Sequence, residues 1–226
     1  MKTIYIIGTS WNVNNITDEE WIKIKKSDTI GLNFAYLKTD LKYLYSHYQT
    51  PILHSNAINH KSIKIYGKWK YGDCKPANET YILKPFEKSF NLEHNILNTT
   101  SNSAFEALHF AFKQKYDRIF MIGFNQRNIK HFYETKKYDW FYEDIENMLL
   151  NIKNIPQLAR DKEMDVLKNT LLSRNENGFN KKFASKYNHF KTFVKYFEIL
   201  RNANIEIFTN NKESIIYDAG AKYKTI

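Results

Sequence analysis

The chain has 226 residues, of which 42% are hydrophobic and 26% charged, and it carries a formal net charge of +10. This length and composition favour one folded domain, and disorder is not the default expectation for them. The single cysteine, Cys74, excludes an internal disulfide and a cluster of thiolate metal ligands. Because no apolar run approaches the ~18 residues of a membrane span and no signal peptide precedes the first predicted strand, we expect a soluble, cytoplasmic protein.

The N-terminal part of the sequence alternates between strand-like and helix-like segments. The apolar run at residues 3–7 predicts a buried strand, and Asp18 is expected to cap a helix that continues to residue 26. Further segments follow in chain order: strands at 28–34 and 51–56, an amphipathic segment between them at 36–48, and candidate strands at 62–69 and 80–86. This β-α-β-α-β order argues for a parallel sheet with right-handed crossovers.

The C-terminal part repeats the same alternation around one long interruption. Small and apolar residues at helical spacing predict a helix from about residue 101, and the run RIFMIGF at 118–124 predicts a strand buried on both faces. Residues 127–182 are polar and aromatic, with helices expected near 140–152 and 158–172, so we interpret them as a helical insertion or lid. An apolar stripe beginning at Phe190 predicts a final long helix, followed by a strand at 205–208.

These elements together predict the fold class. We expect residues 1–226 to form a single Rossmann-like α/β domain with a central, mostly parallel sheet, helices on both faces, and the insertion at 127–182. In such a sheet, ligands bind outside the carboxyl ends of the strands, where the strand order reverses.

Small hydroxyl, amide and glycine residues follow several of the predicted strands, and a helix begins close by. These residue types hydrogen-bond a base or ribose without adding charge, and backbone N–H groups at a helix start favour an anion such as a phosphate. The sequence therefore predicts a nucleotide site. Its candidate residues are Gly8, Thr9, Ser10, Asn33, Asn56, Ser103 and Asn125.

Absent motifs narrow the chemistry. No G-x-G-x-x-G and no Walker A sequence is present, which argues against a nicotinamide dehydrogenase and a P-loop kinase. The chain has no D-x-D pair, and Asp139, Glu143 and Asp144 have the spacing of a solvated acidic helix face. We therefore expect no metal requirement and stabilisation of a leaving phosphate by N–H, Tyr and Arg donors.

Several segments, in order, resemble known families. These are IYIIG at the N-terminus, IGLNFAY, TSNSAFEALHFAFKQKYDRIFMIGFN, and the late helix with IEIFTNNKES. They resemble the bacterial sialyltransferases that use CMP-sialic acid, and equally a broader Rossmann-like group that includes methanopterin-pathway diphosphokinases. The loop TSWN after Gly8 departs from the usual sequence of these families.

The resemblance implies a donor site. By it, Gly8 and Thr9 would line the nucleotide phosphates, Asn33 and Asn56 would hydrogen-bond the donor nucleotide, and Ser103 would meet the donor at a helix start. Asn125 stands where the families usually have Asp.

The resemblance also implies catalytic residues. The sialyltransferases hold the departing phosphate with two Tyr residues that follow the strand corresponding to 118–124 here. The nearby candidates in this chain are Arg127 and Tyr133. Their base is a His just before the final helix, for which His189 is the candidate. Independently of the resemblance, His131 is a second candidate base because it lies in the predicted insertion. A histidine near its ordinary pKa of ~6.5 suits deprotonation of an acceptor hydroxyl.

The leading hypothesis is a metal-independent glycosyltransferase that moves a sugar from a CMP- or UDP-sugar to an acceptor hydroxyl. The acceptor is a saccharide or, as in viral enzymes that glycosylate modified bases, DNA, which the charge of +10 would favour. Two alternatives stay open: a pterin pyrophosphokinase-like diphosphotransferase using ATP and Mg²⁺, and a non-enzymatic nucleic-acid-binding module. Assembly into a homo-oligomer is also left open.

Overall fold

The computed structural model describes residues 1–46, 61–66, 79–82, 103–125, 132, 137, 140, 143–144, 147, 150 and 190–226. These residues contain a single sheet of eight strands, and every pairing in it is parallel. The strands are β1 (Thr3–Ile7), β2 (Asp28–Leu32), β3 (Tyr43–Ser46), β4 (Ile63–Tyr66), β5 (Glu79–Ile82), β6 (Arg118–Ile122), β7 (Glu206–Thr209) and β8 (Lys222–Tyr223).

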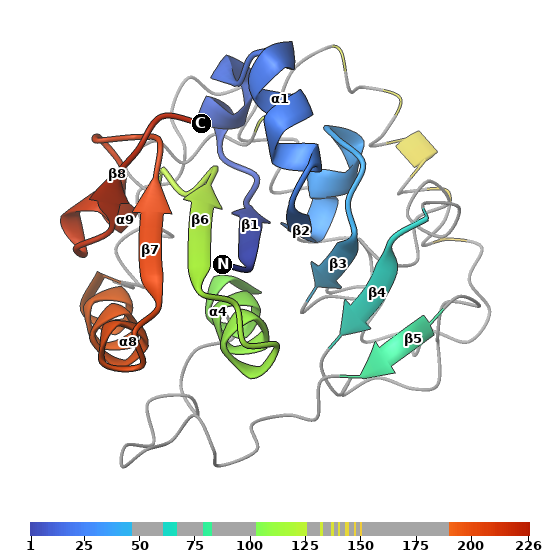
Figure 1. Ribbon diagram of the computed structural model, residues 1–226. Coiled ribbons are helices and arrows are strands. Elements are labelled where there is room, and N and C mark those ends of the chain that lie inside the picture. Colours follow the sequence, from blue (N-terminus) through green and yellow to red (C-terminus); the bar gives the residue numbers. More distant parts are fainter. Residues whose placement is uncertain are drawn as a thin grey trace.

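The strand order is β5-β4-β3-β2-β1-β6-β7-β8, so β1 lies between β2 and β6 (Figure 1). The chain builds outward from β1 to β5 on one side, then crosses back to place β6 on the other side of β1. This reversal defines a Rossmann-like α/β fold, and it puts the topological switch point between β1 and β6. The predicted fold class is confirmed.

Helices cover both faces of the sheet. Helix α4 (Ser103–Lys113), α8 (Phe190–Asn202) and α9 (Ile215–Asp218) share one core with residues such as Ile4, Ile6 and Met121. Helix α1 (Asp18–Lys25) packs into a second core with Ile7 and Ile122, on the opposite face. Figure 1 shows α4 and α8 next to each other on one side, with α1 on the other.

The alternation of side chains along β1 and β6 explains the two cores. Successive residues of a strand point to opposite faces, so a strand covered on both faces must be apolar throughout. The last four residues of each strand are buried in this way. In α4 the small residues Ala104, Ala107 and Ala111 are buried, which lets the helix lie close to the sheet.

Three local predictions are wrong. Asp18 is the first helical residue rather than the cap, because Thr17 caps α1 through a reciprocal capping box with Glu20. The second strand ends at Leu32 and a 3₁₀ helix spans Asn33–Leu37. The segment 36–48 contains strand β3 instead of a second helix.

Other predictions are met or lie outside the described residues. The strands expected at 62–69 and 118–124 appear as β4 and β6, and β5 overlaps the one expected at 80–86 but begins one residue earlier. The final helix and strand appear as α8 and β7. Residues 51–56 and most of 127–182 are outside the described part, although Trp140, Glu143, Asp144, Asn147 and Leu150 are helical. Helix α9 and strand β8 were not anticipated. Among the described segments, no helix has both the length and the apolar character required to cross a bilayer.

Candidate ligand site at the carboxyl edge of the sheet

The ends of β1, β2, β3 and β6 lie at one edge of the sheet. Ile7 pairs with Gly31 on one side and with Ile122 on the other, so the residues that follow each strand start at the same level. Leu32 pairs with Tyr45, which sets Asn33 beside Ser46. The convergence of strand ends expected from the sequence is therefore present in the fold.

Two glycines allow the loops that follow β1 and β6 to lie against each other at this edge. The Gly8 N–H donates to the carbonyl of Ile122 at 2.8 Å, and the Ser10 N–H donates to the carbonyl of Gly123 at 3.1 Å. A Cβ on Gly8 would lie 2.4 Å from the Gly123 carbonyl oxygen, and Gly123 has a φ of +78°. The two loops can approach this closely only without side chains at both positions.

The loop after Gly8 is tied to the loop after β6. The Asn125 N–H donates to the Ser10 Oγ at 2.8 Å, and the Phe132 N–H donates to the Thr9 carbonyl at 2.9 Å. Thr9 is buried, whereas Ser10 and Asn125 are half-buried. Ser10 and the backbone of Thr9 thus hold the two loops together, which is a role the sequence did not predict for them.

Asn33 is the centre of a polar cluster that joins three elements. Its Oδ1 accepts hydrogen bonds from the Ser46 Oγ at 3.0 Å and the Ser103 Oγ at 3.4 Å. Its backbone has a φ of +51°, a left-handed conformation that Asn tolerates better than most residues and that recurs at functional sites. The cluster fixes the amide carbonyl, so the amide NH₂ group is the part of Asn33 left to meet a ligand.

Ser103 begins α4 at the same edge. The geometry of an α-helix leaves its first backbone N–H groups without partners inside the helix, and its dipole favours negative charge there. The Ser103 hydroxyl is engaged with Asn33, so the start of α4 is held beside the ends of β2 and β3. Gly8, Asn33 and Ser103 are therefore at one edge of the molecule, as the sequence predicted.

Glu106 lies one helical turn beyond Ser103 and was missed by the sequence analysis. Burial raises the pKa of its carboxyl from the ordinary 4.5 to about 7. Burial also raises the pKa of Tyr45 and Tyr196, with a further contribution from Glu106. The signal in the sequence was a lone acid within the otherwise apolar stretch SAFEALHFAF.

Ser46 was also missed, because it ends a strand that the sequence did not predict. The predicted residues Asn56, Arg127, His131, Tyr133 and His189 lie outside the described part of the chain. Within the described residues, no group of three or more His, Cys, Asp or Glu side chains has the geometry to hold a metal ion.

The sheet order and this polar edge define an open Rossmann-like α/β protein with a candidate ligand site at its switch point. No family model matches the chain, and neither a curated protein nor a solved structure is significantly similar to it.

Proposed function

We propose that the carboxyl edge of the sheet binds a nucleotide sugar and that the protein is a glycosyltransferase. The observation that carries the proposal is the convergence of Gly8, Asn33 and the start of α4 beside the point where the strand order reverses. Ligands of open α/β sheets bind at this position. The donors that remain for a ligand there are the Asn33 amide NH₂ and the first backbone N–H groups of α4, which are uncharged and suit a nucleoside and its phosphates.

Each of these groups has a distinct role in the proposal. Backbone N–H groups at the start of α4, together with the helix dipole, favour the negative charge of the phosphates. The loop after β1 is held beside the loop after β6, because the Gly8 N–H donates to the Ile122 carbonyl. The Asn33 amide NH₂ donates to an acceptor atom on the base or ribose, while its carbonyl stays bound to Ser46 and Ser103. Such preorganised donors also stabilise a departing phosphate without a metal ion.

We propose that residues outside the described part of the chain supply the reactive groups. We propose His189 or His131 as the base that deprotonates the acceptor hydroxyl, and Arg127 and Tyr133 as donors to the leaving phosphate. Asn56 would contact the donor nucleotide. The role of His131 rests on its place in the predicted insertion, and the other roles rest on the sequence resemblance. Replacing each residue and measuring sugar transfer separately from nucleotide binding tests them.

The sharpest test of the site replaces Asn33 by aspartate. Asn33→Asp keeps an oxygen that accepts from Ser46 and Ser103 and removes the NH₂ donors, so the cluster survives while the ligand contact is lost. We expect calorimetric titration with CMP, UDP and their sugar conjugates to show binding that weakens about tenfold or more in Asn33→Asp. Asn33→Gly, which tolerates the left-handed backbone, should weaken binding similarly.

Asn204→Asp is the matched control. Asn204 also has a left-handed backbone, with a φ of +59°, but it precedes β7 at the opposite edge of the sheet. Its replacement should leave nucleotide affinity unchanged. The proposal is wrong if no nucleotide binds, or if Asn33→Asp binds as tightly as the unmodified protein while melting normally.

The net charge of +10 makes the acceptor a second question for experiment. If the acceptor is DNA, its affinity falls steeply as salt is raised, because binding releases counterions. A saccharide acceptor would show little dependence on salt. Transfer to duplex DNA and to oligosaccharides at two salt concentrations separates the two.

A further inference from the structure

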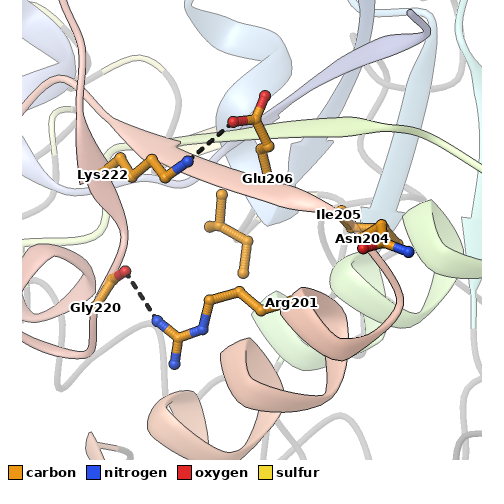
Figure 2. Close-up of a pocket in the computed structure, with 7 residues that line it drawn as sticks. Arg201, Asn204, Ile205, Glu206, Gly220 and Lys222 are labelled. Carbon is orange, nitrogen blue, oxygen red and sulfur yellow. Dashed lines mark hydrogen bonds and ion pairs between the residues drawn. The ribbon is translucent and has the colours of Figure 1, made fainter.

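A pocket of about 290 Å³ lies at the amino edge of the sheet, opposite the proposed nucleotide site. Its walls come from the last turn of α8, the start of β7, and the turn that leads from α9 into β8. Its lining residues are Arg201, Asn204, Ile205, Glu206, Ile207, Gly220 and Lys222 (Figure 2). This volume is just below the usual range of small-molecule sites, ~300–1,000 Å³, and suits a small ligand.

Arg201 contributes a guanidinium group that is held in place but mostly unused. Its Nη1 donates to the Gly220 carbonyl at 3.3 Å, and within the described part of the chain the group makes no other hydrogen bond or ion pair. A guanidinium has five N–H donors in a rigid fork. Four of them are therefore left for a ligand.

Gly220 makes this placement possible. It has a φ of +104°, and a Cβ at this position would lie 2.8 Å from the Arg201 Nη1. Any other residue would push the guanidinium away from the carbonyl that anchors it. A cation near a helix C-terminus also interacts favourably with the helix dipole, but Arg201 is directed across the pocket to Gly220 rather than to the carbonyls of α8 (Figure 2).

The charges on the facing wall are already balanced. Glu206 accepts from Lys222 at 2.9 Å and from Arg118 at 3.1 Å, and these two hydrogen bonds hold the pKa of Glu206 below its ordinary value. One carboxylate thus serves two cations, and with Arg201 the surroundings of the pocket carry a surplus of positive charge. Ile205 and Ile207 are both buried and add apolar surface.

We propose that this pocket is a second binding site, and that it takes a small organic carboxylate whose apolar body lies against Ile205 and Ile207. The carboxylate would accept from the unused edge of the Arg201 guanidinium, a pairing whose geometry allows two parallel hydrogen bonds. The proposal does not depend on the function proposed for the opposite edge, because the two sites share no residue.

Three probes separate the contributions to binding. Benzoate has both the carboxylate and an apolar body, benzyl alcohol has only the apolar body, and inorganic phosphate has only the charge. We expect titration by ligand-observed NMR to give benzoate a dissociation constant of about a millimolar or below. Benzyl alcohol and phosphate should each bind at least about tenfold more weakly. Equal binding of phosphate or of benzyl alcohol would overturn the proposal.

Variants of the full chain then locate the site. Arg201→Gln should weaken benzoate at least tenfold, and Arg201→Lys, which keeps the charge and loses the fork, should weaken it several-fold. The matched control is Lys195→Gln, which removes a charge from an exposed position of α8 that does not line the pocket. Unchanged benzoate affinity in Arg201→Gln, with normal melting of the variant, would refute the proposal.

Discussion

Replacing Gly123 by alanine tests the close approach of the loops that follow β1 and β6. The new Cβ would lie 2.4 Å from the Val13 Cγ2 and 2.9 Å from the Gly8 carbonyl oxygen, and the residue would keep a φ of +78°. The left-handed backbone costs a non-glycine residue about 1–2 kcal/mol, and overpacking a filled site costs about 1–3 kcal/mol. Alanine also reduces the conformational entropy of the unfolded chain, which stabilises the folded state by about 0.4–1 kcal/mol.

We therefore expect Gly123→Ala to lower the free energy of unfolding by about 3 kcal/mol, which for a chain of this size lowers the melting temperature by about 6–12 °C. Differential scanning calorimetry measures the change directly. Gly31→Ala is the control for the left-handed backbone, because Gly31 is not at a positive φ. Its Cβ would meet side chains only, the Leu41 Cδ1 at 2.3 Å, the Leu41 Cδ2 at 2.9 Å and the Ala35 Cβ at 3.1 Å. The control should therefore lose only the overpacking part of the stability.

A double-mutant cycle identifies the cause of the loss. Val13 is fully buried, so Val13→Ala alone should destabilise the protein by creating a cavity. In the Gly123→Ala background the same change also removes the 2.4 Å overlap. The double variant should therefore be more stable than additivity predicts, by about 1 kcal/mol. The left-handed backbone and the overpacking would each lower the melting temperature by about 2 °C or more. The reasoning is refuted if the melting temperature of Gly123→Ala stays within about 2 °C of that of the unmodified protein.

Three further predictions concern helix capping and buried or paired carboxylates. Thr17→Ala should lower stability by about 1 kcal/mol because it removes the cap of α1, and thermal melts should show a smaller loss for Asp18→Ala. The folded-state pKa of Glu106, about 7, is above its ordinary value of 4.5. Its contribution to stability is therefore fully present below pH 4.5 and is lost as the pH rises through 7. Melting curves from pH 5 to 8.5 should show this decline in the unmodified protein and its absence in Glu106→Gln. Burial opposes ionisation of Asp28, but hydrogen bonds from Lys42 and Tyr116 outweigh it and hold the pKa of Asp28 below 3.8. The contribution of Asp28 to stability is therefore present above pH 3.8 and is lost as the pH falls. Asp28→Asn should make the melting temperature less dependent on pH in this acidic range.

The strands at the centre of the sheet could be predicted because their local sequence is apolar throughout, as burial on both faces requires. β1 and β6 are covered on both faces and are continuous apolar runs. Such a run indicates a buried strand even when the neighbouring strands are unknown. The capping box at Thr17 was also readable, since Thr followed three residues later by Glu is its ordinary signature. Choosing Asp18 as the cap overlooked that pairing.

Strand β3 could not be predicted in the same way. Its four residues, YLYS, stand in a segment whose apolar spacing also fits a helix, and propensity alone decides little for so short a run. What makes it a strand is pairing with β2 and β4, which local sequence does not contain. The error carried over to the site, because Ser46 was not recognised as the partner of Asn33.

The individual residues of the site could be named in advance, but their contacts could not. Asn33 and Ser103 are 70 residues apart in the chain, and their hydrogen bond depends on where α4 crosses β2 and β3. The approach of Gly8 to Gly123 likewise depends on two strands becoming neighbours through a crossover. A glycine in a sequence indicates freedom of the backbone, and only the fold shows what uses that freedom.

The fold also changes how the net charge bears on function. In a parallel sheet the helices run back from the carboxyl edge to the amino edge, so their C-termini gather at the amino edge. Cations stand in the last turns there, including Lys25 in α1, Lys113 in α4 and Arg201 in α8, where the helix dipoles stabilise them. These cations therefore have a structural cause and lie away from the proposed nucleotide site. A cation counted in the net charge of +10 need not face an acceptor, so the salt dependence of transfer becomes the measurement that decides between DNA and a saccharide.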